Sequence, residues 1–157
     1  MIVIQNNLVI RVNYMNGGGS IMRANPKMMT EFKFTYLDID VMIQFPDNLT
    51  FITGDSADGK SFLYHIFEIA KTSDACIETF NYTSKSKDLL SIIKGLNDSL
   101  IIIDNADILL SDELRRHIAF DFTNQYVIIG RDPRELMLMS HQIRGIDFTN
   151  KVLTLVP

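Results

Sequence analysis

The feature that most constrains this chain is a glycine-bounded loop that runs from Gly54 to Ser61. Its residues read Gly-Asp-Ser-Ala-Asp-Gly-Lys-Ser, which satisfies the pattern G-x-x-x-x-G-K-[ST] at every fixed position. An apolar segment at 49–53 precedes the loop, and an amphipathic segment at 60–70 follows it. Glycines let successive backbone N–H groups point inward at an anion, and a helix N-terminus adds partial positive charge. We therefore expect this loop to bind a phosphate chain between a strand and a helix.

Residue types within the loop have separate chemical roles. Lys60 would bring a point charge to the terminal phosphate oxygens, and Ser61 would offer its hydroxyl to Mg²⁺. Asp55 and Asp58 place carboxylates in a loop that would hold anions, at small cost if both point to solvent. A glycine-rich turn that only caps a helix is the alternative interpretation. The expected nucleotide-binding residues are Gly54, Asp55, Ser56, Ala57, Asp58, Gly59, Lys60, Ser61 and Phe62.

A second acidic position follows the apolar segment at 100–103. This segment reads Leu-Ile-Ile-Ile, which predicts a strand buried on both faces. Asp104 ends it, 44 residues after Lys60. A phosphate-binding loop needs a carboxylate that holds the metal or its water shell, so we expect Ser61 and Asp104 to bind Mg²⁺. An aspartate that only caps a turn is the alternative.

Together these segments resemble the Walker A and Walker B motifs of the P-loop NTPases, in the division that contains AAA+, ABC and RecA-like ATPases. The resemblance covers residues 49–157. It implies an α/β fold, a three-layer sandwich with a parallel central sheet, in which a strand at 126–129 lies between the strands of the two motifs. It also implies ATP and Mg²⁺ as cofactors. The chain is similar, too, to short, functionally undefined ATP-binding proteins of bacteria.

Two departures from that division bear on catalysis. Asn105 stands where a glutamate normally polarises the attacking water, and an amide orients a water but does not accept its proton. Asp107 is a possible substitute base, or a cap. The sequence contains no Leu-Ser-Gly-Gly-Gln signature, and no segment that predicts a helical lid follows residue 156, so neither an ABC transporter subunit nor a complete AAA+ module is expected. Arg131 follows the strand at 126–129 as a candidate phosphate sensor, or as a surface arginine. The expected catalytic residues are Lys60, Asp104, Asn105, Asp107 and Arg131.

The chain is expected to form a single domain over 1–157. Residues 1–48 are β-rich and predict antiparallel strands or hairpins, an extension on a nucleotide-binding core at 49–157. Within the core, alternating segments predict a parallel sheet. Strands are expected at 49–53, 76–82, 100–103, 126–129 and 152–156, and helices at 60–70, 86–96, 108–120 and after Asp132, where Asp-Pro-Arg-Glu has the form of a helix start.

Composition limits the classes of binding partner and the cellular compartment that we expect. Fifteen Lys+Arg against nineteen Asp+Glu give a formal charge of −4, so a nucleic-acid partner is not indicated. No segment approaches the roughly 20 apolar residues that span a bilayer, and a single cysteine fits a reducing compartment. We expect a cytoplasmic protein without membrane contact. Arg115, Arg116, Arg134 and Arg144 are expected on solvated faces, with a finger acting on a neighbouring subunit as the alternative for each.

Three classes of function remain open. The first is a slow or partner-activated ATPase, a hydrolase that acts as a nucleotide switch with a protein partner or as a homo-oligomer. The second is a nucleotide-binding module without turnover, which Asn105 favours. The third is a small-molecule kinase, ranked last because about 50 residues precede the loop.

Overall fold

The structure is a computed structural model that describes residues 2–5, 8–14, 29–55, 59–85 and 87–157. The described strands are β1 (Ile2–Gln5), β2 (Leu8–Tyr14), β3 (Met29–Tyr36), β4 (Ile39–Gln44), β5 (Leu49–Ile52), β6 (Ile77–Phe80), β7 (Leu100–Ile103), β8 (Gln125–Ile129), β9 (Ile143–Thr149) and β10 (Val152–Val156). The described helices are α1 (Lys60–Lys71), α2 (Leu89–Lys94), α3 (Ala106–Leu109) and α4 (Asp112–Phe120), with 3₁₀ turns η1 (Tyr82–Ser84) and η2 (Ser140–Gln142).

All ten of these strands join one mixed sheet, in the order β1-β2-β3-β4-β10-β9-β5-β8-β7-β6. Four of its nine neighbouring pairs are antiparallel: β1–β2, β2–β3, β3–β4 and β9–β10. The expected three-layer sandwich with a parallel central sheet is therefore wrong. The expected position of one strand is confirmed, because β8 lies between β5 and β7 and is parallel to both.

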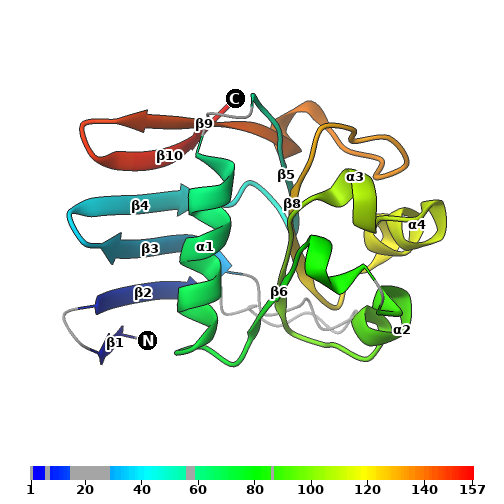
Figure 1. Cartoon of the computed structure of the whole chain (residues 1–157), viewed down its shortest axis with the longest axis horizontal. Helices are drawn as coiled ribbons and strands as arrows, with labels where there is room; N and C mark the ends of the chain where they lie inside the picture. Colours follow the sequence, from blue (N-terminus) through cyan, green and yellow to red (C-terminus); the bar gives the residue numbers. More distant parts are fainter. Residues whose placement is uncertain (1, 6–7, 15–28, 56–58, 86) are drawn as a thin grey trace, which may run out of the picture.

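The sheet curls along its length. In Figure 1, strands β2, β3, β4 and β10 lie across the left of the view, whereas β5, β8 and β6 run up its middle. Helix α1 covers the antiparallel side, and α2, α3 and α4 lie beyond the parallel strands on the right. The sheet thus curves around α1, and the other helices pack on its opposite face.

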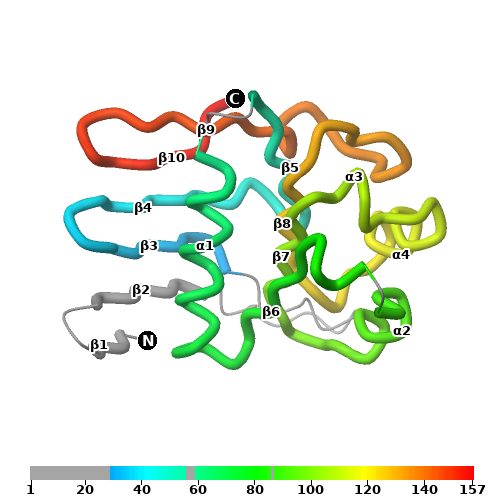
Figure 2. The backbone as a smooth tube through the Cα atoms, in the orientation of Figure 1, coloured from blue at the N-terminus to red at the C-terminus, as the bar shows by residue number. Residues whose placement is uncertain are grey.

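Short turns explain the antiparallel pairs. Asn150 and Lys151 have φ of 53° and 64° and join β9 to β10 in a two-residue hairpin, the turn geometry that matches strand twist. Strand β10 then pairs in parallel with β4, side by side in Figure 2. The antiparallel strands expected before residue 49 are confirmed for β2, β3 and β4. They continue the same sheet as the C-terminal hairpin.

Two helix predictions are wrong in detail. The helix expected at 108–120 is two helices, because Leu110 is extended and Ser111 begins α4 as its N-cap, accepting the Leu114 N–H at 3.2 Å. No α-helix follows Asp132 in the described chain, although the residues have the form of a helix start. The Asp132 carboxylate accepts the Arg134 N–H at 3.0 Å, and Glu135 then has φ of 62°, which ends any helical path.

Alternating residues of β7 supply two cores. Leu100 and Ile102 pack with the α1 side of the sheet, whereas Ile101 and Ile103 pack with α2, α3 and α4. Burial on both faces explains why the strand is apolar throughout. The start of β8 is held by a polar network in which the buried Asp121 carboxylate accepts hydrogen bonds from Thr123, Asn124 and Tyr126.

We predict that Asp121→Asn destabilises the fold in a pH-dependent way. Burial raises the pKa of Asp121, but the hydrogen bonds outweigh it and lower the pKa below 3.8. The stabilisation is therefore complete above about pH 4 and is lost as the pH falls through the lowered pKa. Urea unfolding should give a loss of about 1–3 kcal/mol at pH 7 that shrinks below pH 4.

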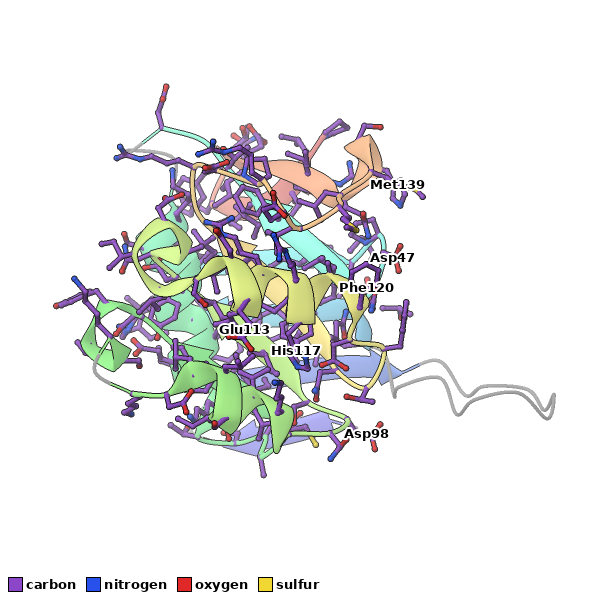
Figure 3. The ribbon with its side chains drawn as sticks, turned by 90° about the vertical axis from the view of Figure 1, so that its right-hand side faces the viewer. Asp47, Asp98, Glu113, His117, Phe120 and Met139 are labelled. Carbon is purple, nitrogen blue, oxygen red and sulfur yellow. The ribbon has the colours of Figure 1, made fainter. Side chains whose placement is uncertain are left out.

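Glu113→Gln, on the exposed face of α4 in Figure 3, is the control. It should change the free energy of unfolding by less than about 0.5 kcal/mol. A penalty for Asp121→Asn that stays constant between pH 7 and pH 3 would contradict the proposed role of the carboxylate.

Candidate functional site

The glycine-bounded loop lies where the sequence predicts it, between the end of β5 and the start of α1, which meet at the same end of the molecule in Figure 2. Gly54 has φ of 140° and Gly59, the N-cap of α1, has φ of 87°. L side chains rarely adopt these conformations, so both positions need glycine. Ser56, Ala57 and Asp58 were expected to bind nucleotide and lie outside the described residues.

The Lys60 side chain folds back over the start of this loop. Its ammonium donates to the Gly54 carbonyl at 2.5 Å and to the Asp55 carbonyl. Ser61 follows in the first turn of α1 with an exposed side chain. Phe62 packs against Tyr36 of β3 with ring centroids 6.4 Å apart, so it joins the packing of α1 on the sheet. Lys60 is thus the cationic group of this loop, and an incoming anion would compete with the two carbonyls for its ammonium.

Asp104 lies at the same edge of the sheet as this loop, because β5 and β7 are both parallel to β8. Its N–H donates to the Phe80 carbonyl at 2.9 Å, which continues the pairing of β7 with β6. Burial raises the pKa of its half-buried carboxyl, while the Asn105 N–H and the Lys60 charge lower it less. Lys60 and Asp104 therefore lie close enough for their charges to interact.

Two α1 residues that the sequence-based prediction missed belong to this charge cluster. Burial raises the pKa of Tyr64 to about 12, and the charges of Glu68 and Asp104 add to that rise. Glu68 also raises the pKa of Asp104. Lys60, Tyr64 and Glu68 are spaced i, i+4, i+8, which places them on one helix face. That spacing is the sequence signal that would have found them.

Asn105 has a structural reason to be asparagine. Its φ of 54° and ψ of 42° are left-handed, and it is the N-cap of α3. Asparagine adopts this conformation far more readily than glutamate does. Its Oδ1 also accepts the Tyr82 N–H at 3.4 Å. Asparagine at position 105 is therefore favoured by the backbone turn after β7.

Asp107 is engaged with the backbone beyond β8. Its carboxylate accepts the N–H groups of Arg131, at 3.0 Å, and of Asp132, at 2.9 Å. These bonds hold the start of the loop that follows β8. Asp107 thus anchors the backbone beside the end of β8. To act as a base, its carboxylate would have to accept a proton while it also accepts these N–H groups.

Arg131 follows the end of β8, between the strands that carry the loop and Asp104, and its side chain is exposed. Gly130 before it is a close-approach position, since a Cβ there would lie 2.9 Å from the Cβ of Ala106. The absence of that atom lets α3 pack against β8. The edge of the sheet thus collects the expected residues Lys60, Asp104, Asn105, Asp107 and Arg131.

Arg115 was expected on a solvated face, and that expectation is wrong. Its side chain is buried and donates to the carbonyls of Leu110, Asp132 and Arg134. Arg116 and Arg134 are exposed as expected, and each has an acidic neighbour.

Comparison with protein-family models, with curated proteins and with solved structures found no match to this chain. Within the described ranges, no group of three or more His, Cys, Asp or Glu side chains is arranged to hold a metal ion. None of the described helices has the length and apolarity needed to cross a membrane.

We predict that Lys60→Met raises the pKa of the Asp104 carboxyl further above its ordinary value. The Lys60 charge opposes the effect of burial, and a neutral side chain of similar length removes that opposition. An NMR titration of ¹³C-labelled aspartate carboxyls measures the change. Lys71→Met, at the other end of α1, should leave the Asp104 titration unchanged. An Asp104 pKa that is the same in Lys60→Met and in wild type would contradict this arrangement.

Proposed function

We propose that this chain is a P-loop nucleotide-binding protein that binds Mg²⁺-ATP through residues 54–61 and hydrolyses it slowly or with a partner's help. One observation carries the proposal: the glycine-bounded loop, with Lys60 in it, lies at the same sheet edge as the half-buried Asp104, within range of its charge. A phosphate chain needs the first group and its metal needs the second.

The loop conformation supports phosphate binding. Gly54 and Gly59 have positive φ, and Lys60 bonds to the carbonyls at the loop's start. The twelve-residue helix α1 begins at Lys60 and so adds the partial positive charge of its N-terminus. An anion there gains backbone donors, the helix end and one ammonium.

The donor set near the loop suits Mg²⁺. Ser61 and Asp104 offer oxygen ligands, and Mg²⁺ usually takes one or two protein ligands and keeps several waters. Asp104 also fits a cation on independent grounds, since burial disfavours its charged form and a cation would compensate that charge. Ser61 and Asp104 would hold the ion, which would neutralise phosphate charge.

The proposal that ATP hydrolysis is slow rests on Asn105 and Asp107. The first is an amide that accepts the Tyr82 N–H, and the second bonds to the N–H groups of Arg131 and Asp132. Neither is a free carboxylate beside an attacking water. These contacts favour slow hydrolysis, and they equally support the second candidate, a nucleotide-binding module without turnover. Phosphate release from bound ATP separates the two.

We predict that Lys60→Ala lowers the affinity for Mg²⁺-ATP at least tenfold and leaves the chain folded. The reason is the loss of a charge-assisted contact to phosphate, which is typically worth about 1.5–3 kcal/mol. Isothermal titration with ATP, GTP and ADP, each with and without Mg²⁺, gives affinity, base preference and metal dependence. Lys71→Ala is the matched control on the same helix. Equal ATP affinity in folded Lys60→Ala and wild type would overturn the proposed site.

We predict that Asn105→Glu raises the rate of ATP hydrolysis by about 10²–10⁴-fold, because a carboxylate can take the proton of the attacking water. Single-turnover phosphate release at saturating Mg²⁺-ATP measures it. Asn105→Gln has the same size and the same backbone strain as Asn105→Glu without the carboxylate, so it should gain nothing.

Asp107→Asn tests whether the Asp107 carboxylate is the base in the wild-type protein. Loss of the wild-type rate in Asp107→Asn, together with no gain in Asn105→Glu, would contradict the role given to Asn105 and make Asp107 the base. Both variants are compared at equal nucleotide occupancy.

A further inference from the structure

Arg115 is a buried cation whose described hydrogen bonds all go to backbone carbonyls. Its side chain lies on α4 and is only 6% exposed. Nη1 donates to the Asp132 carbonyl at 2.7 Å and to the Arg134 carbonyl at 3.1 Å, and Nε donates to the Leu110 carbonyl at 3.4 Å. Burying a guanidinium is costly unless its donors are used. We therefore infer that the buried Arg115 side chain holds the loop that contains Asp132 and Arg134.

That loop starts at Arg131, directly after β8, and is held on its other side by α3. Asp107 accepts the N–H groups of Arg131 and Asp132. Asp132 is thus bound through both its N–H and its carbonyl, by side chains of two different helices. Its carboxylate adds bonds to Arg134, whose guanidinium is the main reason that the pKa of Asp132 falls to about 2.

The backbone of the same loop is in a conformation that needs such support. Glu135 has φ of 62° and Met137 has φ of 51°. Left-handed backbone at residues other than glycine costs about 1–3 kcal/mol and persists where surrounding contacts over-determine it. Arg115 and Asp107 provide such contacts directly before these two residues, at Arg131, Asp132 and Arg134.

We propose that Arg115 is a positioning residue that sets the response of Arg131 to the terminal phosphate of the nucleotide, an inference that rests on the proposed function. Arg131 is the residue of this loop at the edge shared by Lys60 and Asp104, and its N–H is already fixed by Asp107. Arg115 fixes the next stretch of backbone from α4, through the carbonyls of Asp132 and Arg134. Helix α4 is thereby linked to the loop of Arg131 through hydrogen bonds from the Arg115 side chain to main-chain carbonyls.

The chemistry of the guanidinium explains why arginine serves here. Its planar fork presents donors in fixed directions, so that Nε reaches the Leu110 carbonyl just before α4 while Nη1 reaches two loop carbonyls. Lysine has one donor atom and could keep the loop carbonyls without Leu110. Methionine keeps the apolar stem and loses every bond. Arginine, lysine and methionine at position 115 therefore form a series in which the number of hydrogen bonds to the loop decreases.

The test compares Mg²⁺-dependent binding of ADP with that of a non-hydrolysable ATP analogue, by calorimetry. We expect Arg115→Met to reduce the preference for the triphosphate about tenfold, the value of one charge-assisted bond, with little change in ADP affinity. Arg131→Met should do the same, and the double variant should lose no more than either. Arg115→Lys should retain part of the preference. Glu113→Gln, another exposed residue of α4, should retain all of it.

A wild-type triphosphate preference in folded Arg115→Met would overturn the proposal, as would full additivity with Arg131→Met. Amide hydrogen exchange without nucleotide provides the second readout: the N–H groups of Arg131 and Asp132 should exchange at least about tenfold faster in Arg115→Met, with α1 unchanged. Unaltered exchange would disprove the positioning role itself. If wild type binds neither nucleotide, the proposed function and the phosphate part of this inference both fail, while the exchange result still decides whether Arg115 positions the loop.

Discussion

Parallel pairing of β8 with β5 on one side and with β7 on the other is the interaction on which the candidate site depends. Parallel strands end at the same edge of a sheet, so this pairing brings together the residues at the carboxyl ends of the three strands. The glycine-bounded loop comes after β5, Asp104 after β7 and Arg131 after β8. Separated in sequence by tens of residues, these groups become neighbours only through the register of the three strands.

Close packing and hydrogen bonds around the end of β8 fix the position of α3 beside that edge. Gly130 leaves room for Ala106, so α3 approaches the strand closely. Asp107 on α3 then accepts the Asp132 N–H, and Arg115 on α4 donates to the Asp132 carbonyl. A helix of four residues has little stability of its own. Its position is secured by contacts with β8 and the loop, which couples the turn at Asn105 to the loop at Arg131.

The rest of the sheet explains where the motif-based expectation failed. A resemblance based on two motifs concerns the strands that carry them and has no information on the hairpins at the chain's ends. Strand β9 reads Ile-Arg-Gly-Ile-Asp-Phe-Thr, with its exposed side chains clustered at one end, so its pattern is weak. It nevertheless pairs with β5 and begins the hairpin that joins β4 to the core. The outcome is one mixed sheet.

Local chemistry in the sequence was sufficient to place the glycine-bounded loop and the buried strand before Asp104, since each depends on near neighbours in the chain. The position of β8 between the strands of the two motifs was expected from the resemblance to P-loop NTPases and not from local chemistry. The tertiary structure alone decided that the antiparallel strands join the core sheet through β10 and β9, that Asp107 is an anchor and that Arg115 is buried. These features depend on residues far along the chain. Nothing near Arg115 in the sequence distinguishes it from a surface arginine, and it is buried because it bonds to the loop at 132–134. Likewise, Asp132-Pro133-Arg134-Glu135 has every local sign of a helix start, but long-range contacts to Asp107 and Arg115 hold the segment in another conformation.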